Sequence, residues 1–121
     1  MEKKSDMELR RSDVILVPFP FTDLTSTKVR PAVIISSDPQ GEDITIAFIS
    51  SVVPKSIQNT ELLLARSHPD FSSTGLKKDS IFKMKKLLTL HNSLILRKLG
   101  HLTPALQEEI DTFLKKALGL T

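Results

Sequence analysis

The chain has 121 residues, of which 40% are hydrophobic and 26% are charged, and its formal net charge is +3. This length suits one domain with a single core, and the composition is that of a globular protein rather than a disordered one. No apolar run approaches the roughly 18 residues that cross a bilayer, so we expect no membrane association.

Residues 1–11 carry seven charged side chains and no apolar segment. We therefore predict no secretory signal and a cytoplasmic location, with residues 1–11 as a poorly ordered extension and residues 12–121 as one domain. The chain has no cysteine, and its three histidines (68, 91 and 101) lack metal-ligand spacing. We expect no disulfide, no metal and no cofactor.

Two apolar runs near the N-terminus predict a pair of strands. Val14–Phe19 is rich in β-branched residues and should end near Pro18, because proline cannot donate to a sheet ladder. Residues 22–28 are polar and form the connecting loop, and Pro31–Ile35 is the second strand. Arg30 stands at the start of that strand beside a rigid proline. Its planar fork of donors is suited to holding a phosphate.

The middle of the chain predicts shorter strands. Asp43–Ser50 alternates, with Ile44, Ile46 and Phe48 on one face. We interpret residues 51–60 as a long mobile loop, residues 61–65 as a short strand and residues 68–75 as another loop.

Two further strands are predicted before the C-terminal helix. Ser80–Lys85 alternates again, so that Lys83 and Lys85 share one face and should project together. Leu94–Leu99 is expected to be the last strand, although its periodicity alone also suits a helix.

The C-terminus predicts a helix. Thr103 is a suitable N-cap with Pro104 in the first turn, and Gly119 ends the segment. Apolar residues recur at helical spacing within it: Leu106, Ile110, Phe113, Leu114 and Ala117. The expected fold class is therefore α+β, mainly β: a small barrel or strongly bent antiparallel sheet with a C-terminal helix.

Positive charge is concentrated in residues 77–98. This segment has seven lysine or arginine residues and one aspartate, a formal net charge of about +6, whereas the rest of the chain is net negative. Such a face is typical of proteins that bind polyanions, because neutralised phosphates release counterions. A solvated surface without a ligand is the alternative.

Several sequence blocks together resemble the MazF/PemK family of toxin endoribonucleases from type II toxin-antitoxin pairs. The family begins with a Gly-Asp-Val/Ile-Val segment and an Arg-Pro-Ala-Val-Val-Ile/Leu strand, and it has a later strand that ends in a hydroxyl-bearing pair. The corresponding blocks here are Ser12-Asp13-Val14-Ile15, Arg30-Pro31-Ala32-Val33-Ile34-Ile35, Ser50-Ser51, Gly75-Leu76-Lys77-Lys78-Asp79-Ser80 and Lys98-Leu99-Gly100-His101-Leu102-Thr103-Pro104. Two family residues differ: Ser12 replaces a glycine, and Ser50 replaces the active-site threonine.

The resemblance implies a metal-independent, sequence-selective endoribonuclease that cleaves single-stranded RNA, including messenger RNA, by attack of the RNA 2′-hydroxyl. Arg30 and Ser50 would be catalytic, with Ser51 as the alternative hydroxyl. Residues expected to bind the substrate are Phe21, Thr22, Lys28, Ser51, Lys77, Lys83 and Lys85. The resemblance also implies an SH3-like barrel, a homodimer and a cognate antitoxin with an acidic disordered segment.

Two alternatives remain open at the level of sequence. CcdB-like toxins share this fold and bind DNA gyrase without cleaving nucleic acid. A degenerate family member would bind RNA without cutting it. Neither alternative gives Arg30 and Ser50 a catalytic role.

Overall fold

The computed structural model describes residues 8–18, 28–38 and 41–120. Within them the elements are, in chain order, β1 (Asp13–Pro18), β2 (Val29–Ser37), β3 (Asp43–Ser50), β4 (Glu61–Leu64), the 3-10 turn η2 (Ser72–Thr74), β5 (Ser80–His91), the 3-10 turn η3 (Asn92–Leu94), β6 (Arg97–His101) and α1 (Pro104–Leu118). The strands form one sheet in the order β4-β5-β3-β2-β1-β6, and all neighbouring pairs are antiparallel.

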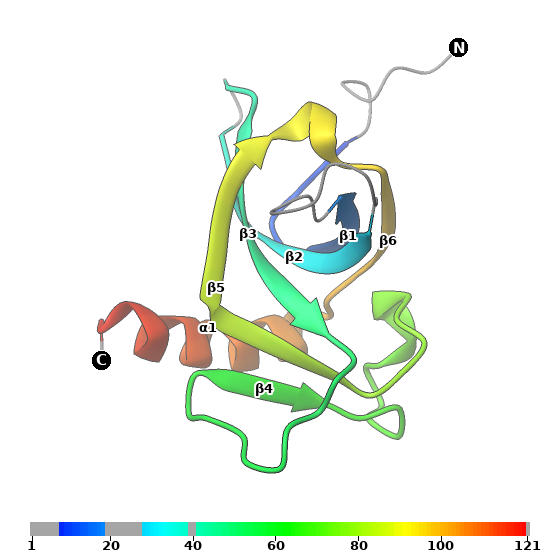
Figure 1. Cartoon of the computed structure of the whole chain (residues 1–121), viewed down its shortest axis with the longest axis vertical. Coiled ribbons are helices and arrows are strands. Elements are labelled where there is room, and N and C mark those ends of the chain that lie inside the picture. The colour runs from blue at the N-terminus through cyan, green and yellow to red at the C-terminus, as the bar shows by residue number, and fades with distance from the viewer. Residues whose placement is uncertain (1–7, 19–27, 39–40, 121) are drawn as a thin grey trace.

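The sheet curls into a half-barrel and buries residues on both faces. Figure 1 shows β1, β2 and β6 wrapping toward one another, while α1 lies across β5 near β4. Strand alternation separates two cores: Val33 belongs to the core that α1 covers, and its neighbours Ala32 and Ile34 belong to the core inside the curl. The predicted α+β fold with a strongly bent antiparallel sheet is confirmed.

Strand β5 is longer than predicted and contains a bulge. It runs from Ser80 to His91 and pairs with β3 on both sides of a register shift, with Phe48 opposite Lys83 but Ala47 opposite Leu87. Residues 84–86 are therefore extra residues on β5, and they break the alternation that the sequence predicted beyond Lys83. The bulge lets this long strand bend with the curl of the sheet and pair with neighbouring strands on both sides of the bend.

The last strand begins later than predicted. Residues 92–94 form η3, and β6 covers Arg97–His101, where it pairs with β1 at the sheet edge. The alternative helix for residues 94–99 is not formed. Ile95 is fully buried in the core inside the curl, whereas Leu94 and Leu96 are exposed, which explains why the apolar run has no single helical face.

The C-terminal helix has the predicted caps. The Thr103 side chain accepts a hydrogen bond from the Leu106 amide at 3.2 Å, and Gly119 takes a left-handed conformation after the last turn. Leu106, Ile110 and Leu114 are buried against the sheet. In the described part of the chain, no helix combines the length and apolar character that a membrane span requires.

Arg11 joins the start of β1 to the helix. Its Nε donates to the Ile35 carbonyl at 2.7 Å, and its guanidinium forms an ion pair with Asp111 of α1. Ser12 follows with a φ of 85°, a conformation that favours glycine. The family that the sequence resembles has a glycine at this position. Of the predicted extension, residues 8–11 are therefore described, and residues 1–7 lie outside the described residues.

Replacing Asp111 is expected to change the acid sensitivity of folding. Burial raises the pKa of the Asp111 carboxyl, but hydrogen bonds from Arg11 and Gln107 outweigh it, so the net pKa is lowered. A lowered pKa contributes stability that is present above the unfolded-state value, near pH 4, and is lost as the pH falls through the folded-state value. Asp111→Asn should therefore unfold at a lower temperature at pH 7, and the gap to the wild type should narrow below about pH 4.

Thermal unfolding followed by circular dichroism between pH 2 and 7 measures this gap. Glu108→Gln removes an exposed acid from the same helix and serves as the control. A gap that stays constant across the whole pH range would contradict the assignment.

Candidate functional site

A cavity of about 210 Å³ opens where β2 and β3 meet the bulged part of β5. It brings together side chains from three strands that are far apart in sequence. Its lining residues are Arg30, Phe48, Ile49, Ser50, Lys83 and Lys86.

Strand register explains why Arg30 and Ser50 share this cavity. Ala32 of β2 lies opposite Phe48 of β3 in an antiparallel pair. Arg30 is two residues before Ala32 and Ser50 is two residues after Phe48, so alternation directs both side chains to the same face of the sheet. Arg30 also lies opposite Val17 of β1, which fixes its place between two neighbouring strands.

The Ser50 hydroxyl already accepts one hydrogen bond. The amide of Val52 donates to Ser50 Oγ at 3.1 Å. This bond uses the oxygen as an acceptor and leaves its proton available for an oxygen atom of a ligand. Ser51 is exposed and does not line the cavity, so the described geometry associates Ser50 rather than Ser51 with Arg30.

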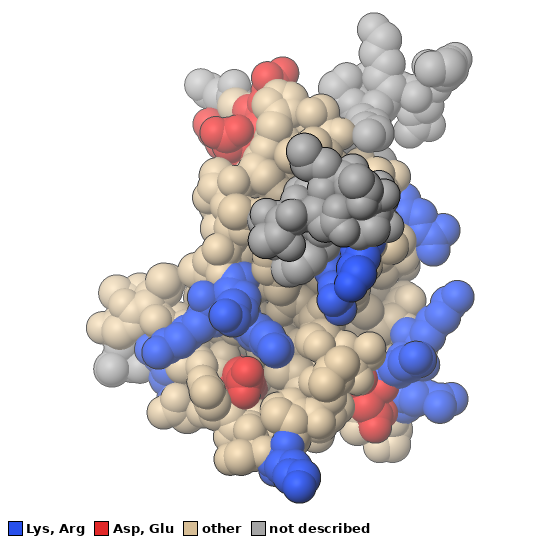
Figure 2. Space-filling model, viewed as in Figure 1, with Lys and Arg blue, Asp and Glu red and all other residues tan. Residues whose placement is uncertain are grey.

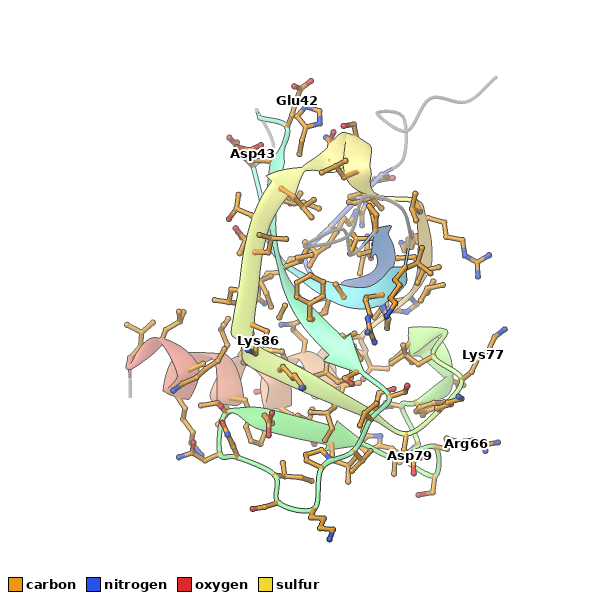
Figure 3. All side chains as sticks on the ribbon, viewed as in Figure 1. Glu42, Asp43, Arg66, Lys77, Asp79 and Lys86 are labelled. Carbon is orange, nitrogen blue, oxygen red and sulfur yellow. The ribbon has the colours of Figure 1, made fainter. Side chains whose placement is uncertain are left out.

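Two lysines of β5 complete the charge of the cavity. Lys83 is half-buried opposite Phe48, and Lys86 comes from the bulge. The predicted common projection of Lys83 and Lys85 rests on unbroken alternation, and the bulge interrupts it; Lys85 is exposed and does not line the cavity. In Figure 2, basic side chains gather over the middle of β5, where Figure 3 labels Lys86.

The remaining predicted substrate residues lie elsewhere or outside the described chain. Lys77 lies in the loop before β5 and does not line the cavity; Figure 3 labels it at the right-hand edge of the view, away from Lys86. Lys28 is exposed just before β2 and does not line the cavity. Phe21 and Thr22 fall among residues that the structure does not describe.

Sequence reasoning missed Lys86, Phe48 and Ile49 as lining residues. The sequence predicts Phe48 on the strand face that carries Ile44 and Ile46, and Phe48 does pack against the core inside the curl. Lys86 was visible only as part of a lysine run. Its place in the cavity depends on the bulge, and residues 80–91 contain no glycine or proline that would indicate one.

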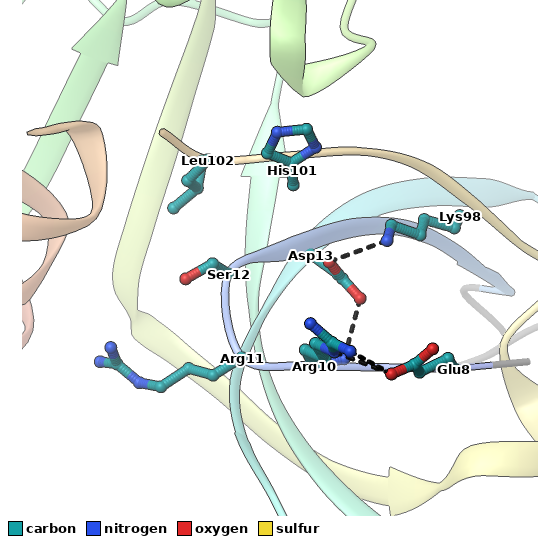
Figure 4. Close-up of a pocket in the computed structure, with 8 residues that line it drawn as sticks. All are labelled: Glu8, Arg10, Arg11, Ser12, Asp13, Lys98, His101 and Leu102. Carbon is teal, nitrogen blue, oxygen red and sulfur yellow. Dashed lines mark hydrogen bonds and ion pairs between the residues drawn. The ribbon is translucent and has the colours of Figure 1, made fainter. Parts of the chain in front are cut away.

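A second, larger cavity of about 510 Å³ lies beside the turn that precedes β1 (Figure 4). Its charged side chains already have partners: Glu8 with Arg10, Arg11 with Asp111, and Asp13 with Lys98 at 3.2 Å. The hydrogen bond with Arg10 lowers the pKa of Glu8. Asp13 is nearly fully buried and also accepts from the Arg10 amide at 2.8 Å. We interpret this cavity as a structural turn region.

The smaller cavity differs in its chemistry. Its described lining combines one guanidinium, two ammonium groups and one hydroxyl, with Phe48 and Ile49 as its apolar wall. No carboxylate or imidazole is among these residues; His101 lines the second cavity, and His91 bonds Glu42 and Ser93 at the far end of β5. Such a set can bind and polarise an anion. Across the described residues, no group of histidines and acids could hold a metal ion.

Residues 10–118 match a family model described as the PemK-like, MazF-like toxin of type II toxin-antitoxin systems. The chain belongs to this toxin family. The match includes all residues that line the smaller cavity and all six strands of the toxin. No curated protein sequence matches the toxin significantly.

Solved structures share the fold of the toxin at low sequence identity. A mycobacterial endoribonuclease, determined in complex with its cognate antitoxin, is 20% identical with a TM-score of 0.72, and the alignment covers 94% of this chain and 98% of that one. MazF-mt6, a toxin of Mycobacterium tuberculosis, is 18% identical with a TM-score of 0.70 and coverage of 90% and 98%. A MazE-MazF structure from Deinococcus radiodurans is 15% identical with a TM-score of 0.73 and coverage of 96% and 100%.

Proposed function

We propose that this toxin is a metal-independent endoribonuclease that cleaves single-stranded RNA, including messenger RNA, at selected sequences. The observation that carries the proposal is that Arg30 and Ser50, from neighbouring strands, line one cavity together with two lysines. Membership of the PemK/MazF-like toxin family supports it. So do the mycobacterial neighbours, which are endoribonucleases.

Cleavage begins when the RNA 2′-hydroxyl attacks the adjacent phosphorus. The nonbridging oxygens of the resulting phosphorane carry more negative charge than the starting diester, so donors aimed at them lower the barrier. Arg30 supplies the cation, and the Ser50 proton donates to a nonbridging oxygen. Arginine is protonated at neutral pH and is a poor base, so it stabilises charge and can give a proton to the departing 5′-oxygen. It regains a proton from solvent, which takes up the proton released by the 2′-hydroxyl. The products are a 2′,3′-cyclic phosphate, or its ring-opened form, and a 5′-hydroxyl.

The part of the RNA strand that lies outside the cavity is held by contacts that need a less exact geometry. Lys83 lies within the cavity, and phosphate contacts of this kind set affinity rather than sequence. We assign backbone binding to Lys28, Lys77 and Lys85, and contacts with the bases or sugars to Phe21, Thr22 and Ser51. An aromatic ring such as Phe21 stacks readily on unpaired bases.

The toxin is proposed to act as a homodimer and to be inhibited by a cognate antitoxin. An acidic disordered segment of the antitoxin would compete with RNA for the substrate-binding lysines of segment 77–98, which are Lys77, Lys83 and Lys85. The neighbours that were determined with an antitoxin support this assignment.

The two adjacent serines are expected to differ in their effect on cleavage. Ser50→Ala removes the hydroxyl that lines the cavity and should slow cleavage by roughly 10- to 100-fold. Ser51→Ala removes an exposed hydroxyl outside the cavity and should change the rate by less than about threefold. Single-turnover cleavage of one labelled RNA measures both variants. A larger loss with Ser51→Ala than with Ser50→Ala would assign the active hydroxyl to Ser51.

The direct test of the proposed function is incubation of the purified toxin with a long single-stranded RNA in EDTA. Discrete cuts with 2′,3′-cyclic phosphate ends are expected. If RNAs of varied sequence stay intact while the protein traps DNA gyrase on its substrate, the toxin acts as a CcdB-like protein instead. Intact RNA that still binds the protein would indicate a degenerate member.

A further inference from the structure

The cavity carries more positive charge than one phosphodiester needs. A phosphodiester linkage has one negative charge, yet Lys83 and Lys86 alone bring two positive charges to a space of about 210 Å³ that Arg30 also lines. Like charges in one small cavity oppose each other, because solvent screens them only in part. An anion with two charges compensates them better than an anion with one.

The two lysines of this cavity have no acidic partner among the described residues. Ion pairs in the described chain involve Arg10, Arg11, His91 and Lys98, and neither Lys83 nor Lys86 takes part in one. Glu61 of β4 lies opposite Lys83 in the register, but its carboxylate accepts the Gln58 amide at 2.9 Å and it does not line the cavity. Of the two lysines, Lys86 is therefore the one whose charge is less compensated by acidic residues of the neighbouring strands.

We propose that the cavity of Arg30, Ser50, Lys83 and Lys86 selects a phosphate dianion, and that a terminal 3′-phosphate of an RNA strand is its preferred resting ligand. The inference deepens the proposed function and rests on it for the source of the ligand. The cyclic product is a diester with one charge. Addition of water opens the ring, frees the 2′-hydroxyl and leaves a 3′-phosphate monoester with close to two charges above its second pKa near 6.

This selectivity has two consequences for the same site. The phosphorane that forms during cleavage also has one charge more than the diester, so Lys86 favours it over the bound substrate. Conversely, a strand that ends in a 3′-phosphate occupies the cavity and competes with uncut RNA. Cleavage should slow as ring-opened ends accumulate.

Binding of uncleavable strands tests the inference separately from catalysis. The probes are two fluorescent pools of random 2′-O-methyl tetranucleotides, which lack the attacking hydroxyl; one pool ends in a 3′-phosphate and the other in a 3′-methylphosphate. They differ at the cavity by one charge and one methyl group. At pH 8, fluorescence anisotropy should show the 3′-phosphate pool binding the wild type roughly three- to tenfold more tightly.

Lys86→Gln should reduce this preference to less than about twofold. Lys78→Gln is the matched control, because it removes an equal charge from an exposed position outside the cavity and should keep the preference. Equal binding of the two pools by the wild type, or an undiminished preference in Lys86→Gln, would overturn the inference. Inorganic phosphate that competes as strongly as the 3′-phosphorylated pool would overturn the strand end as the ligand.

The outcomes separate this inference from the proposed function. A charge preference that depends on Lys86, in a protein that leaves RNA intact, supports the dianion site and rejects the ribonuclease. RNA cleavage without any charge preference supports the ribonuclease and rejects the dianion site.

Discussion

Arg30→Ala is expected to reduce RNA cleavage by about 10³-fold or more, with discrete cuts disappearing from a standard assay. Arg30 is the only guanidinium among the described residues that line the cavity, and its donors are the ones that match two phosphate oxygens at once. Lys83 and Lys86 retain positive charge in the variant but lack that geometry. The measurement is single-turnover cleavage in EDTA, with wild type and variant at equal protein concentration.

Two controls make this result specific for the guanidinium. Arg97→Ala removes an exposed arginine from the edge strand β6, so it tests the loss of one charge away from the cavity. It should change the rate by less than about threefold. Arg30→Lys keeps the charge without the fork and should recover only a small part of the activity. Full activity in Arg30→Ala would remove the basis of the ribonuclease assignment.

The pair Arg30 and Ser50 was predicted from the sequence blocks that resemble the toxin family, and strand alternation, which is a local property, places both side chains on one face of the sheet. Arg30 stands at a strand start and Ser50 at a strand end, so neither position depends on the curvature of the sheet. The structure brings both to one cavity, as the sequence blocks suggested. The catalytic role of the pair remains a proposal that the cleavage assays test.

The basic part of the site was less predictable from the sequence. A bulge depends on how a long strand forms hydrogen bonds with two neighbouring strands at once, which is a property of the folded sheet. Here β5 pairs with β4 through residues 80–83 and with β3 along most of its length, and the extra residues fall between the two paired segments of β3. The bulge therefore decides that Lys86 reaches the cavity with Lys83, whereas Lys85 does not.

Tertiary contact also explains two glycines in the blocks that carried the family resemblance. Gly75 ends the turn η2, and Gly100 lies in β6, 25 positions later in the chain. A Cβ on Gly75 would lie 2.1 Å from the Leu99 carbonyl oxygen, and a Cβ on Gly100 would lie 2.2 Å from the Ser73 carbonyl oxygen. The two blocks thus pack against each other through backbone, so each needs a residue without a side chain.

Gly75→Ala is expected to destabilise the fold by more than about 3 kcal/mol, or roughly 10–20 °C in unfolding temperature. Two effects add at this position. Its φ of 74° costs an alanine about 1 kcal/mol, and the new Cβ would press on the Leu99 carbonyl of β6, which lies at a register shift between Lys98 and Gly100, the residues that pair with β1. Backbone on this strand cannot move aside as the end of a flexible side chain can.

Gly119→Ala separates these two effects within the same chain. Its φ of 72° is nearly that of Gly75, but no atom lies within 4 Å of the position that its Cβ would take. Gly119→Ala should therefore show the conformational cost alone, about 1 kcal/mol. Urea unfolding of both variants measures the difference, which reports the contact between η2 and β6. Equal losses of stability in the two variants would mean that β6 yields at Leu99 and that the close approach contributes little to the fold.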